Sequence, residues 1–218
     1  MTPKQFIASL AEIRLPDVFN PYAQCCDVFD RADAAQRRRK NLQTFLECSL
    51  DQKVETMWIA RDLGYRGGRR TGVPLTDDVH LPLVGELLGC LELQRATKGP
   101  VVAERTAAVI WSVLTRIKQP VLLWNVFPYH PHEPGDPFSN RAHTAAERAI
   151  TLPLLNILID MFHPRRLVAI GRDAENALEC MNIQIATVRH PSYGGQSEFI
   201  GGVFKLYGVT GQYRSQLS

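Results

Sequence analysis

Four short runs of apolar residues have the length and composition of buried strands. They are Val54 to Ala60, Val121 to Phe127, Leu167 to Gly171 and Ile183 to Val188. Each run is rich in β-branched, leucine or aromatic side chains, as expected for parallel strands that are covered on both faces. The pattern therefore predicts a central four-stranded parallel sheet.

Other segments repeat their apolar residues at helical spacing. They are Leu81 to Leu93, Val101 to Ile117, Ala145 to Phe162 and Asp173 to Met181. An amphipathic segment around Phe6 and Leu10 opens the chain, and a helix capped by Asp33 is expected to run to about Leu50. Strands that alternate with helices predict an α/β fold, here a three-layer α/β/α sandwich with right-handed crossovers.

Length and composition fit one globular unit. The 218 residues, 45% of them apolar, can bury one substantial core. Because no linker or low-complexity tract is visible, we expect a single domain over 1–218, with an irregular N-terminal arm over about 1–32. The net charge of +3 is too small to indicate a polyanionic partner by itself. The run from Arg37 to Lys40 is expected to be a solvated helix face.

The cysteines and the hydropathy pattern indicate the cellular compartment in which the protein is expected. Five cysteines, at positions 25, 26, 48, 90 and 180, lack the paired spacing of a disulfide framework or a zinc ribbon. No charged-then-apolar leader opens the chain, and no run approaches the ~20 apolar residues of a membrane span. We expect a cytoplasmic monomer that does not engage a membrane.

The most unusual sequence follows each predicted strand. These segments read ARDLGYRGGRRTG, NVFPYHPHEPGDPFSNR, GRDAENA and RHPSYGG. Ligands of a parallel sheet bind beyond the carboxyl ends of its strands. Gly, Pro, Asn and His hold special backbone shapes or perform polar chemistry. The pattern therefore predicts a functional site built from these four loops.

The order and content of the loops resemble the uracil-DNA glycosylase superfamily. The similar bacterial members have a first motif like GEAPGYRGCRRTGVPFT and a last motif HPSxGG. NPYAQCC, WNVFPYHPH, SNRAHT and IGRDAENAL extend the resemblance from about Asn20 to Gly208. HPS alone occurs by chance, but the joint order is specific. The resemblance implies a monofunctional DNA glycosylase that flips a pyrimidine out of DNA and hydrolyses its N-glycosidic bond, with DNA as partner and no cofactor.

Asp62 and His190 are the catalytic residues that the resemblance implies. Arg61 replaces the glutamate of the bacterial motif, and Asp62 matches the acidic residue of a GQDPY version. Asp62 would polarise the attacking water and stabilise the positive sugar, and His190 would hydrogen-bond the carbonyl oxygen of the leaving base. Outside this context, Asp62 would be read as a strand-end turn residue and His190 as a core histidine.

Three residues bear on base recognition. Asn125 ends the second strand, where its amide offers a donor and an acceptor to a pyrimidine edge, or else pairs with backbone. Gly64 leaves open the space beside C5 that a tyrosine fills in the GQDPY version, and Leu75 replaces a stacking phenylalanine. The roomier pocket suggests either uracil or a bulky 5-modified cytosine, such as the glucosylated hydroxymethylcytosine of phage DNA, which would indicate antiviral defence.

The expected DNA contacts lie mainly in two loops. Arg66, Arg69 and Arg70 form a candidate phosphate track, to which Arg141 and Arg189 could add, although each of these last two could equally pair with a carboxylate. Backbone N–H groups at Ser192 and Gly194 would approach a phosphate at the start of the last helix. Tyr193 could enter the space that the flipped base leaves.

Two other classes compete with the glycosylase. A metal-dependent hydrolase would use His130, His132 and His163, but HxH in a proline-rich loop lacks a second ligand cluster. The cysteines do not reproduce a four-ligand iron–sulfur pattern either, so no metal is expected. A catalytically silent DNA-binding module would have kept the fold and lost the family's Glu and Pro; the carboxylate of Asp62 argues against it.

Overall fold

A sheet of four parallel strands forms the centre of the computed structural model, which describes residues 1–89, 93–179, 181 and 183–209. Its order is β3-β2-β5-β6, with β2 at Thr56–Asp62, β3 at Leu122–Phe127, β5 at Arg166–Ile170 and β6 at Gln184–Val188. Each strand lies within two residues of a predicted run, so the predicted sheet is confirmed.

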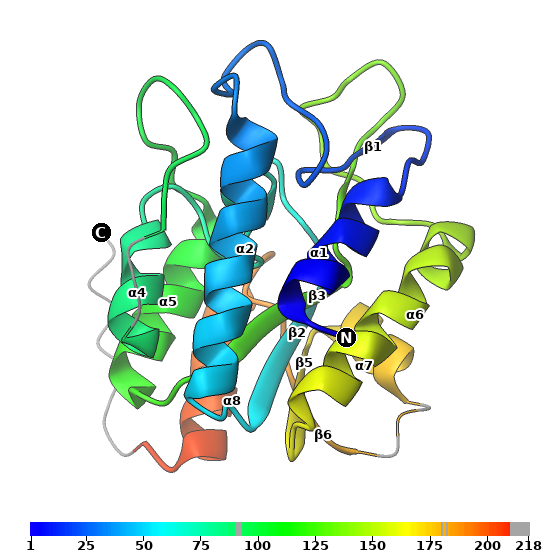
Figure 1. Ribbon diagram of the computed structural model, residues 1–218. Helices are drawn as coiled ribbons and strands as arrows, with labels where there is room; N and C mark the ends of the chain where they lie inside the picture. The colour runs from blue at the N-terminus through cyan, green and yellow to red at the C-terminus, as the bar shows by residue number, and fades with distance from the viewer. Residues whose placement is uncertain (90–92, 180, 182, 210–218) are drawn as a thin grey trace.

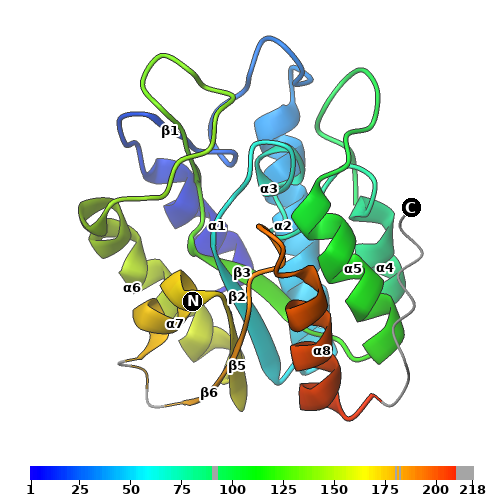
Figure 2. The same ribbon diagram turned by 180° about the vertical axis from the view of Figure 1, so that it is seen from behind.

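Helices cover both faces of the sheet, as Figures 1 and 2 show. On one side lie α1 (Pro3–Glu12), α6 (Ala145–Phe162) and α7 (Arg172–Leu178). On the other lie α2 (Ala34–Asp51), α4 (Leu81–Leu88), α5 (Arg105–Ile117) and α8 (Gln196–Tyr207). The predicted three-layer sandwich is confirmed.

Large aromatic side chains fill the two interfaces between helices and sheet. Trp58 of β2 packs edge-on against Phe199 of α8, and Trp124 of β3 packs against Phe6 of α1 on the opposite face. Both tryptophans are fully buried. Burial of such side chains is the largest favourable contribution to folding, so these rings fix α8 and α1 to their faces of the sheet.

Helix ends agree with the predicted bounds where capping signals are strong. The helix α6 begins and ends as predicted, because Thr144 and Glu147 form a reciprocal capping box. Gly89, with φ of 62°, ends α4 before the predicted Leu93. Residues 90–92 of that predicted helix, and residue 180 of the predicted helix that became α7, lie outside the described residues.

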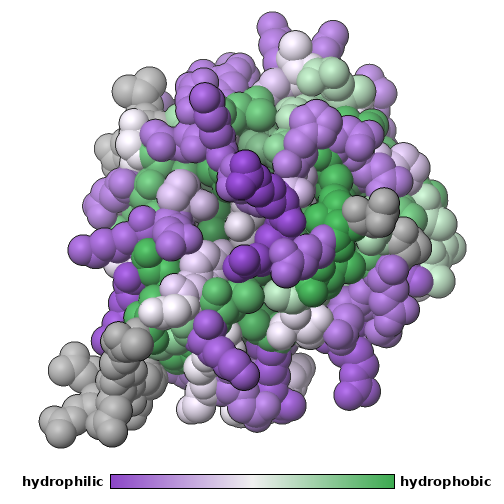
Figure 3. Space-filling view, turned by 90° about the horizontal axis from the view of Figure 1, so that it is seen from below, coloured by the Kyte–Doolittle hydropathy of each residue, from purple (hydrophilic) through white to green (hydrophobic). Residues whose placement is uncertain are grey.

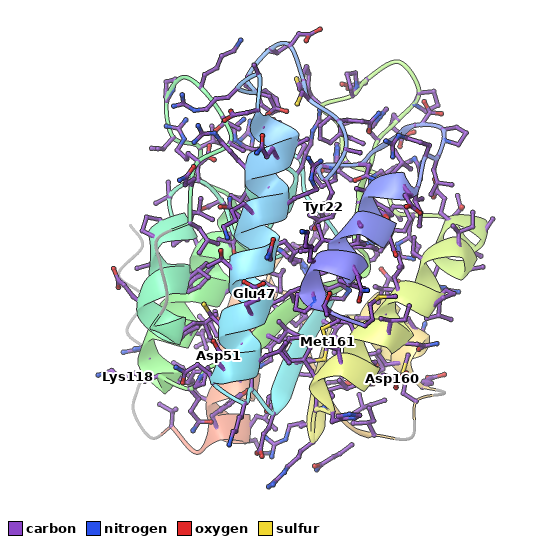
Figure 4. The ribbon with its side chains drawn as sticks, viewed as in Figure 1. Tyr22, Glu47, Asp51, Lys118, Asp160 and Met161 are labelled. Carbon is purple, nitrogen blue, oxygen red and sulfur yellow. The ribbon has the colours of Figure 1, made fainter. Side chains whose placement is uncertain are left out.

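Two expectations for α2 are wrong. Asp33 occupies the N-cap position but makes no capping hydrogen bond, because its carboxylate pairs with Arg37 at 2.8 Å. Arg38 is not solvated: its side chain is fully buried and paired with Asp30 of the arm. The arm covers this part of α2, whereas Glu47 and Asp51 point outward from the helix (Figure 4).

The N-terminal arm is fastened to the body by side-chain hydrogen bonds to backbone. Asn20 donates through Nδ2 to the carbonyls of Leu10 and Ile13, at 2.8 and 2.9 Å. Tyr22 lies between α1 and α2 (Figure 4), and its hydroxyl donates to the carbonyl of Gly72 at 3.3 Å. Because these bonds use buried backbone acceptors, they order an arm that has little regular structure.

Three small elements were not predicted. The strand β1 (Val18–Phe19) pairs antiparallel with β4 (His130–Pro131), and α3 (Gly68–Thr71) forms within the loop after β2. The β1–β4 pair joins the arm to the long loop after β3. Both loops are therefore held in place above the carboxyl ends of the strands.

The end of the molecule where the strands begin has a mixed surface. Figure 3 shows hydrophilic side chains there, with hydrophobic ones between them. Within the described part of the chain, no helix is both long and apolar enough to cross a membrane.

Candidate active site

A cavity of about 390 Å³ lies at the carboxyl ends of β2, β5 and β6. All four predicted strand-end loops contribute to its wall: 60–64 and Gly68 from the first, Asn140 and Arg141 from the second, 171–173 from the third, and His190, Ser192 and Tyr193 from the fourth. Its size falls in the range of small-ligand clefts, roughly 300–1,000 Å³. The position expected for a ligand of a parallel sheet is therefore a real cavity.

Asp62 is the last residue of β2, and both of its carboxylate oxygens are engaged. Oδ2 accepts a hydrogen bond from Arg61 Nε at 2.5 Å, and Oδ1 is in hydrogen-bond contact with His143 Nδ1. Arg61 also donates from Nη1 to Asp173 at 2.8 Å. The Asp62 side chain is only 7% exposed. Charge-assisted bonds from two sides fix the orientation of this carboxylate on the cavity wall.

His143 is a site residue that sequence reasoning missed. Its ring stacks on Phe127, with centroids 5.2 Å apart and planes 27° apart. Phe127 is the register partner of Asp62 across β2 and β3, and this pairing brings the imidazole to the carboxylate. The resemblance at SNRAHT covered His143 without indicating a role for it.

His190 is held as a neutral hydrogen-bond donor. Its Nδ1 accepts the backbone N–H of Ser192 at 3.2 Å and contacts Ser192 Oγ at 2.7 Å. Burial lowers the pKa of the imidazole, the Arg61 cation lowers it further, and Asp173 opposes them. A neutral ring whose Nδ1 accepts must carry its proton on Nε2. His190 thus offers one N–H donor on the cavity wall.

Asn125 is not among the residues that line the cavity, although its register partner is. It is fully buried, and neither Oδ1 nor Nδ2 has a hydrogen-bond partner among the described residues. Asn125 pairs in register with Ala60, which lines the cavity, so the two side chains leave the sheet on the same face. A buried amide without partners costs about 1–3 kcal/mol. Such a group calls for an explanation, and a bound polar ligand would supply its missing partners.

Gly64 and Leu75 both line the cavity, as expected for residues that shape it. Leu75 has a φ of 56°, in the left-handed region that is costly for a branched side chain. Strain of this kind persists only where the surrounding structure enforces it. The cavity wall at Leu75 is therefore built at a cost to stability.

The HPSYGG loop presents Tyr193 to solvent. Tyr193 is 96% exposed, with φ of 51°, and Gly194 follows at 79°. A Cβ added at Gly195 would lie 2.2 Å from the carbonyl oxygen of His190, so this tight turn requires glycine there. Arg189 is also exposed, with its Nε 3.5 Å from a carboxylate oxygen of Glu198.

The three arginines of the predicted phosphate track lie in different environments. Arg70 is 4% exposed and pairs with Asp78 at 2.8 Å, and Arg69 is 1% exposed with its guanidinium 4.0 Å from the ring centroid of Phe19. Their burial contradicts the prediction that they contact DNA phosphate, because α3 turns both side chains inward. Arg66 alone of the three is exposed, and it donates to the Tyr65 hydroxyl at 2.7 Å.

The histidines of the candidate metal site serve other contacts. Both ring nitrogens of His130 are engaged, Nδ1 with Arg69 at 3.1 Å and Nε2 with the Ser139 carbonyl at 2.7 Å. His163 ends α6 in a left-handed conformation. Over the described ranges, no three His, Cys, Asp or Glu side chains are grouped so that they could hold a metal ion.

Glu104, an acidic residue that the sequence did not indicate, also lines the cavity. It precedes α5, in a segment that lies outside the four strand-end loops. Burial raises the pKa of its carboxyl group. The cavity wall therefore carries three carboxyl groups, from Asp62, Glu104 and Asp173, and Asp62 and Glu104 lie in different surroundings.

Comparison with solved structures finds a similar fold. Wild-type SMUG2 of Pedobacter heparinus superposes with a TM-score of 0.64, over 95% of this chain and 97% of that chain, at 14% sequence identity. At this identity the similarity concerns the fold. No protein-family model and no curated protein matches the sequence.

Proposed function

We propose that this protein is a monofunctional DNA glycosylase, which flips a pyrimidine nucleotide out of DNA and hydrolyses its N-glycosidic bond. The observation that carries the proposal is one cavity that holds an oriented carboxylate, Asp62, and a neutral imidazole donor, His190. The fold supports it, since SMUG2 belongs to the uracil-DNA glycosylase superfamily. The motif order of the four loops supports it independently.

In the proposed mechanism the two side chains act on opposite charges of the transition state. As the bond between C1′ and the base breaks, the Asp62 carboxylate stabilises the positive sugar, orients a water molecule and accepts its proton. The Nε2–H of His190 donates to the carbonyl oxygen on which negative charge accumulates. The Asn125 amide, which lacks protein partners, would bind the edge of the base.

The residues proposed to hold DNA surround the mouth of the cavity. Tyr193, held in solvent, would fill the gap that the flipped nucleotide leaves in the stack. The backbone N–H of Gly194, next to the start of α8, would bind a phosphate, whereas the Ser192 N–H already donates to His190. Arg66 and Arg189 are exposed cations that would contribute electrostatic attraction.

Two substrate classes fit the proposal, uracil and a bulky 5-modified cytosine such as glucosylated hydroxymethylcytosine. The cavity volume of about 390 Å³ and the modest side chain of Leu75 favour the larger base, although the Glu104 carboxyl group occupies the space beside Gly64. A preference of this kind would suit defence against phages with modified DNA. Uracil release would instead indicate repair.

The test is incubation with duplexes that contain uracil, a thymine mismatch, 5-hydroxymethylcytosine or its glucosylated form, followed by alkaline cleavage at abasic sites. We expect release of at least one base, undiminished by chelator. We also expect no covalent adduct after borohydride, because none of the four loops carries a lysine to form a Schiff base with the sugar. DNA binding without any base release would indicate a silent module, and activity that is lost with chelator and restored by zinc would indicate a metal hydrolase.

A further inference from the structure

The side chain of Glu104 does more than cap a helix. Glu104 is the N-cap of α5, where its Oε2 accepts the backbone N–H of Ala107 at 3.2 Å. Ser, Thr, Asp and Asn are the usual residues at this position, because their shorter side chains reach the same N–H groups. The capping hydrogen bond uses one carboxyl oxygen of Glu104. Capping therefore does not explain why a glutamate, with its longer side chain, stands at this position.

The loop after β2 makes room for this carboxyl group. A Cβ added at Gly67 would lie 2.8 Å from Glu104 Oε2, and one added at Gly64 would lie 3.4 Å from Oε1. The Glu104 carboxyl group therefore packs on bare backbone of the loop whose first residues include Asp62. Because Asp62 and Glu104 both line the cavity, a base bound there would face a wall that carries both acids.

The surroundings of Glu104 favour its neutral form. Burial has the largest effect and raises the pKa of the carboxyl group, and the nearby Asp77 carboxylate raises it further. Hydrogen bonds from the Ala107 N–H and the Thr106 side chain, and the charge of His80, lower the pKa but do not reverse its direction. The Glu104 backbone N–H itself donates to Asp77 Oδ2 at 2.6 Å. Asp62, by contrast, accepts bonds from Arg61 and His143. Two carboxyl groups in such different surroundings can divide the acid and base roles of glycosidic-bond hydrolysis.

We infer that Glu104 is a further catalytic residue, the acid that protonates the departing base. The inference rests on the proposed glycosylase function. As the C1′–N bond breaks, its electron pair passes to the base, and the carboxyl proton of Glu104 moves to a ring nitrogen or oxygen of that base. Water adds its oxygen to C1′ and gives a proton to Asp62. Solvent then carries a proton from Asp62 back to Glu104, so the cycle balances.

Glu104→Gln tests this step, because glutamine keeps the size, the cap and a hydrogen-bond donor but has no proton to transfer. We expect single-turnover base release by the wild type to fall as pH rises through the raised pKa of Glu104. The variant should be slower by about 10²–10⁴-fold and should lack this alkaline limb, with DNA affinity unchanged. Glu86→Gln, on the exposed surface of α4, is the matched control and should behave as wild type.

An infrared measurement separates this inference from the proposed function. In an infrared pH titration, the carbonyl stretch of one carboxylic acid should persist above the pH at which ordinary carboxyl groups lose their proton, and this band should be missing in Glu104→Gln. A band unchanged by the substitution would overturn the inference, whether or not the protein releases bases. Wild-type rates in Glu104→Gln would overturn it and leave the glycosylase proposal standing. If the wild type releases no base from any duplex, both proposals are wrong.

Discussion

At the scale of single residues, Arg61 occupies the place of an acidic residue in the bacterial motif that this chain resembles. Its side chain donates to Asp62 and to Asp173, so it links the end of β2 to the start of α7. The Arg61 side chain is 42% exposed, and an ion pair in that setting contributes little to stability. Its main effect is to orient the Asp62 carboxylate and to add positive charge where the bacterial motif has an acidic residue.

Asp62→Asn and Asn125→Ala should have different kinetic profiles. Loss of the Asp62 carboxylate should lower base release by about 10²–10³-fold or more, with DNA affinity nearly unchanged, because its charge acts in the transition state. Asn125→Ala should weaken both the rate and the discrimination among bases. Single-turnover kinetics on the duplex panel, with binding measured separately, check both. Near-parental release by Asp62→Asn would move the water-activating role to another acid.

His143→Ala should lower the single-turnover rate by about 10–100-fold, because the Asp62 carboxylate loses one of its two side-chain donors and with it part of its alignment. His143→Asn, whose amide N–H can replace Nδ1–H, should recover part of the loss. His132→Ala is the control from the same loop, since His132 Nδ1 contacts the Glu133 carbonyl and not Asp62. Equal rates for the Ala and Asn variants would mean that the ring acts only by packing on Phe127.

At the scale of elements, the loop after β2 shows why charge in a sequence does not predict exposure. YRGGRR presents three arginines within six residues, but α3 forms inside it and directs Arg69 and Arg70 inward. The rings that receive Arg69 come from distant segments, Phe19 and Phe29 of the arm and Phe138 of the loop after β3. A sequence shows none of these partners, because they meet only in the folded chain.

Arg69→Ala and Arg66→Ala should therefore separate stability from DNA binding. Arg69→Ala removes buried contacts with three rings and a donor to the Pro137 carbonyl, so we expect a loss of about 2–4 kcal/mol in the free energy of unfolding. Arg66→Ala should change it by less than about 0.5 kcal/mol. It should instead weaken DNA binding and reduce the salt dependence of log Kd by about one unit. The reverse pattern in urea unfolding and salt titration would contradict both assignments.

Strands and long helices could be predicted because their signals are local. The β2 and β3 runs are apolar enough to indicate burial on both faces, and Thr144 with Glu147 marks the start of α6. The β1–β4 pair could not be predicted, because two-residue strands depend on a partner more than a hundred residues away. Asp33 likewise has the residue type of a helix cap, but a neighbouring arginine competes for its carboxylate.

At the scale of the whole molecule, the sequence located the site better than it identified the members of the site. All four strand-end loops meet at one cavity, since the carboxyl ends of parallel strands share one edge of the sheet. Asp62, Gly64, Leu75, His190, Ser192 and Tyr193 line it. His143 and Glu104 reach the site through the register of β3 and the N-terminus of α5, and these are long-range packing features that no local pattern encodes.

The long loop after β3 pairs with the arm at His130, and the ring of His130 contacts Arg69 and the Ser139 carbonyl. His130 is fully buried, and burial first and the Arg69 cation second lower its pKa to about 3, from an ordinary value of 6.5. The unfolded chain takes up this proton below pH 6.5, whereas the folded protein does so only near pH 3. The folded state therefore loses stability as pH falls through that window, by about 1.4 kcal/mol per pH unit from this group.

His130→Gln should reduce this acid sensitivity, because glutamine can donate to the Ser139 carbonyl and accept from Arg69 without titrating. We expect the variant to lose about 2 kcal/mol less than the wild type between pH 6.5 and 4.5, measured as the free energy of unfolding in urea. The difference must grow as pH falls, since the sign follows from protonation of the unfolded chain. His132→Gln, in the same loop, should follow the wild type. Parallel stability curves for His130→Gln and wild type would mean that the folded protein already accepts a proton on His130 near pH 6, and that the loop is open to water there.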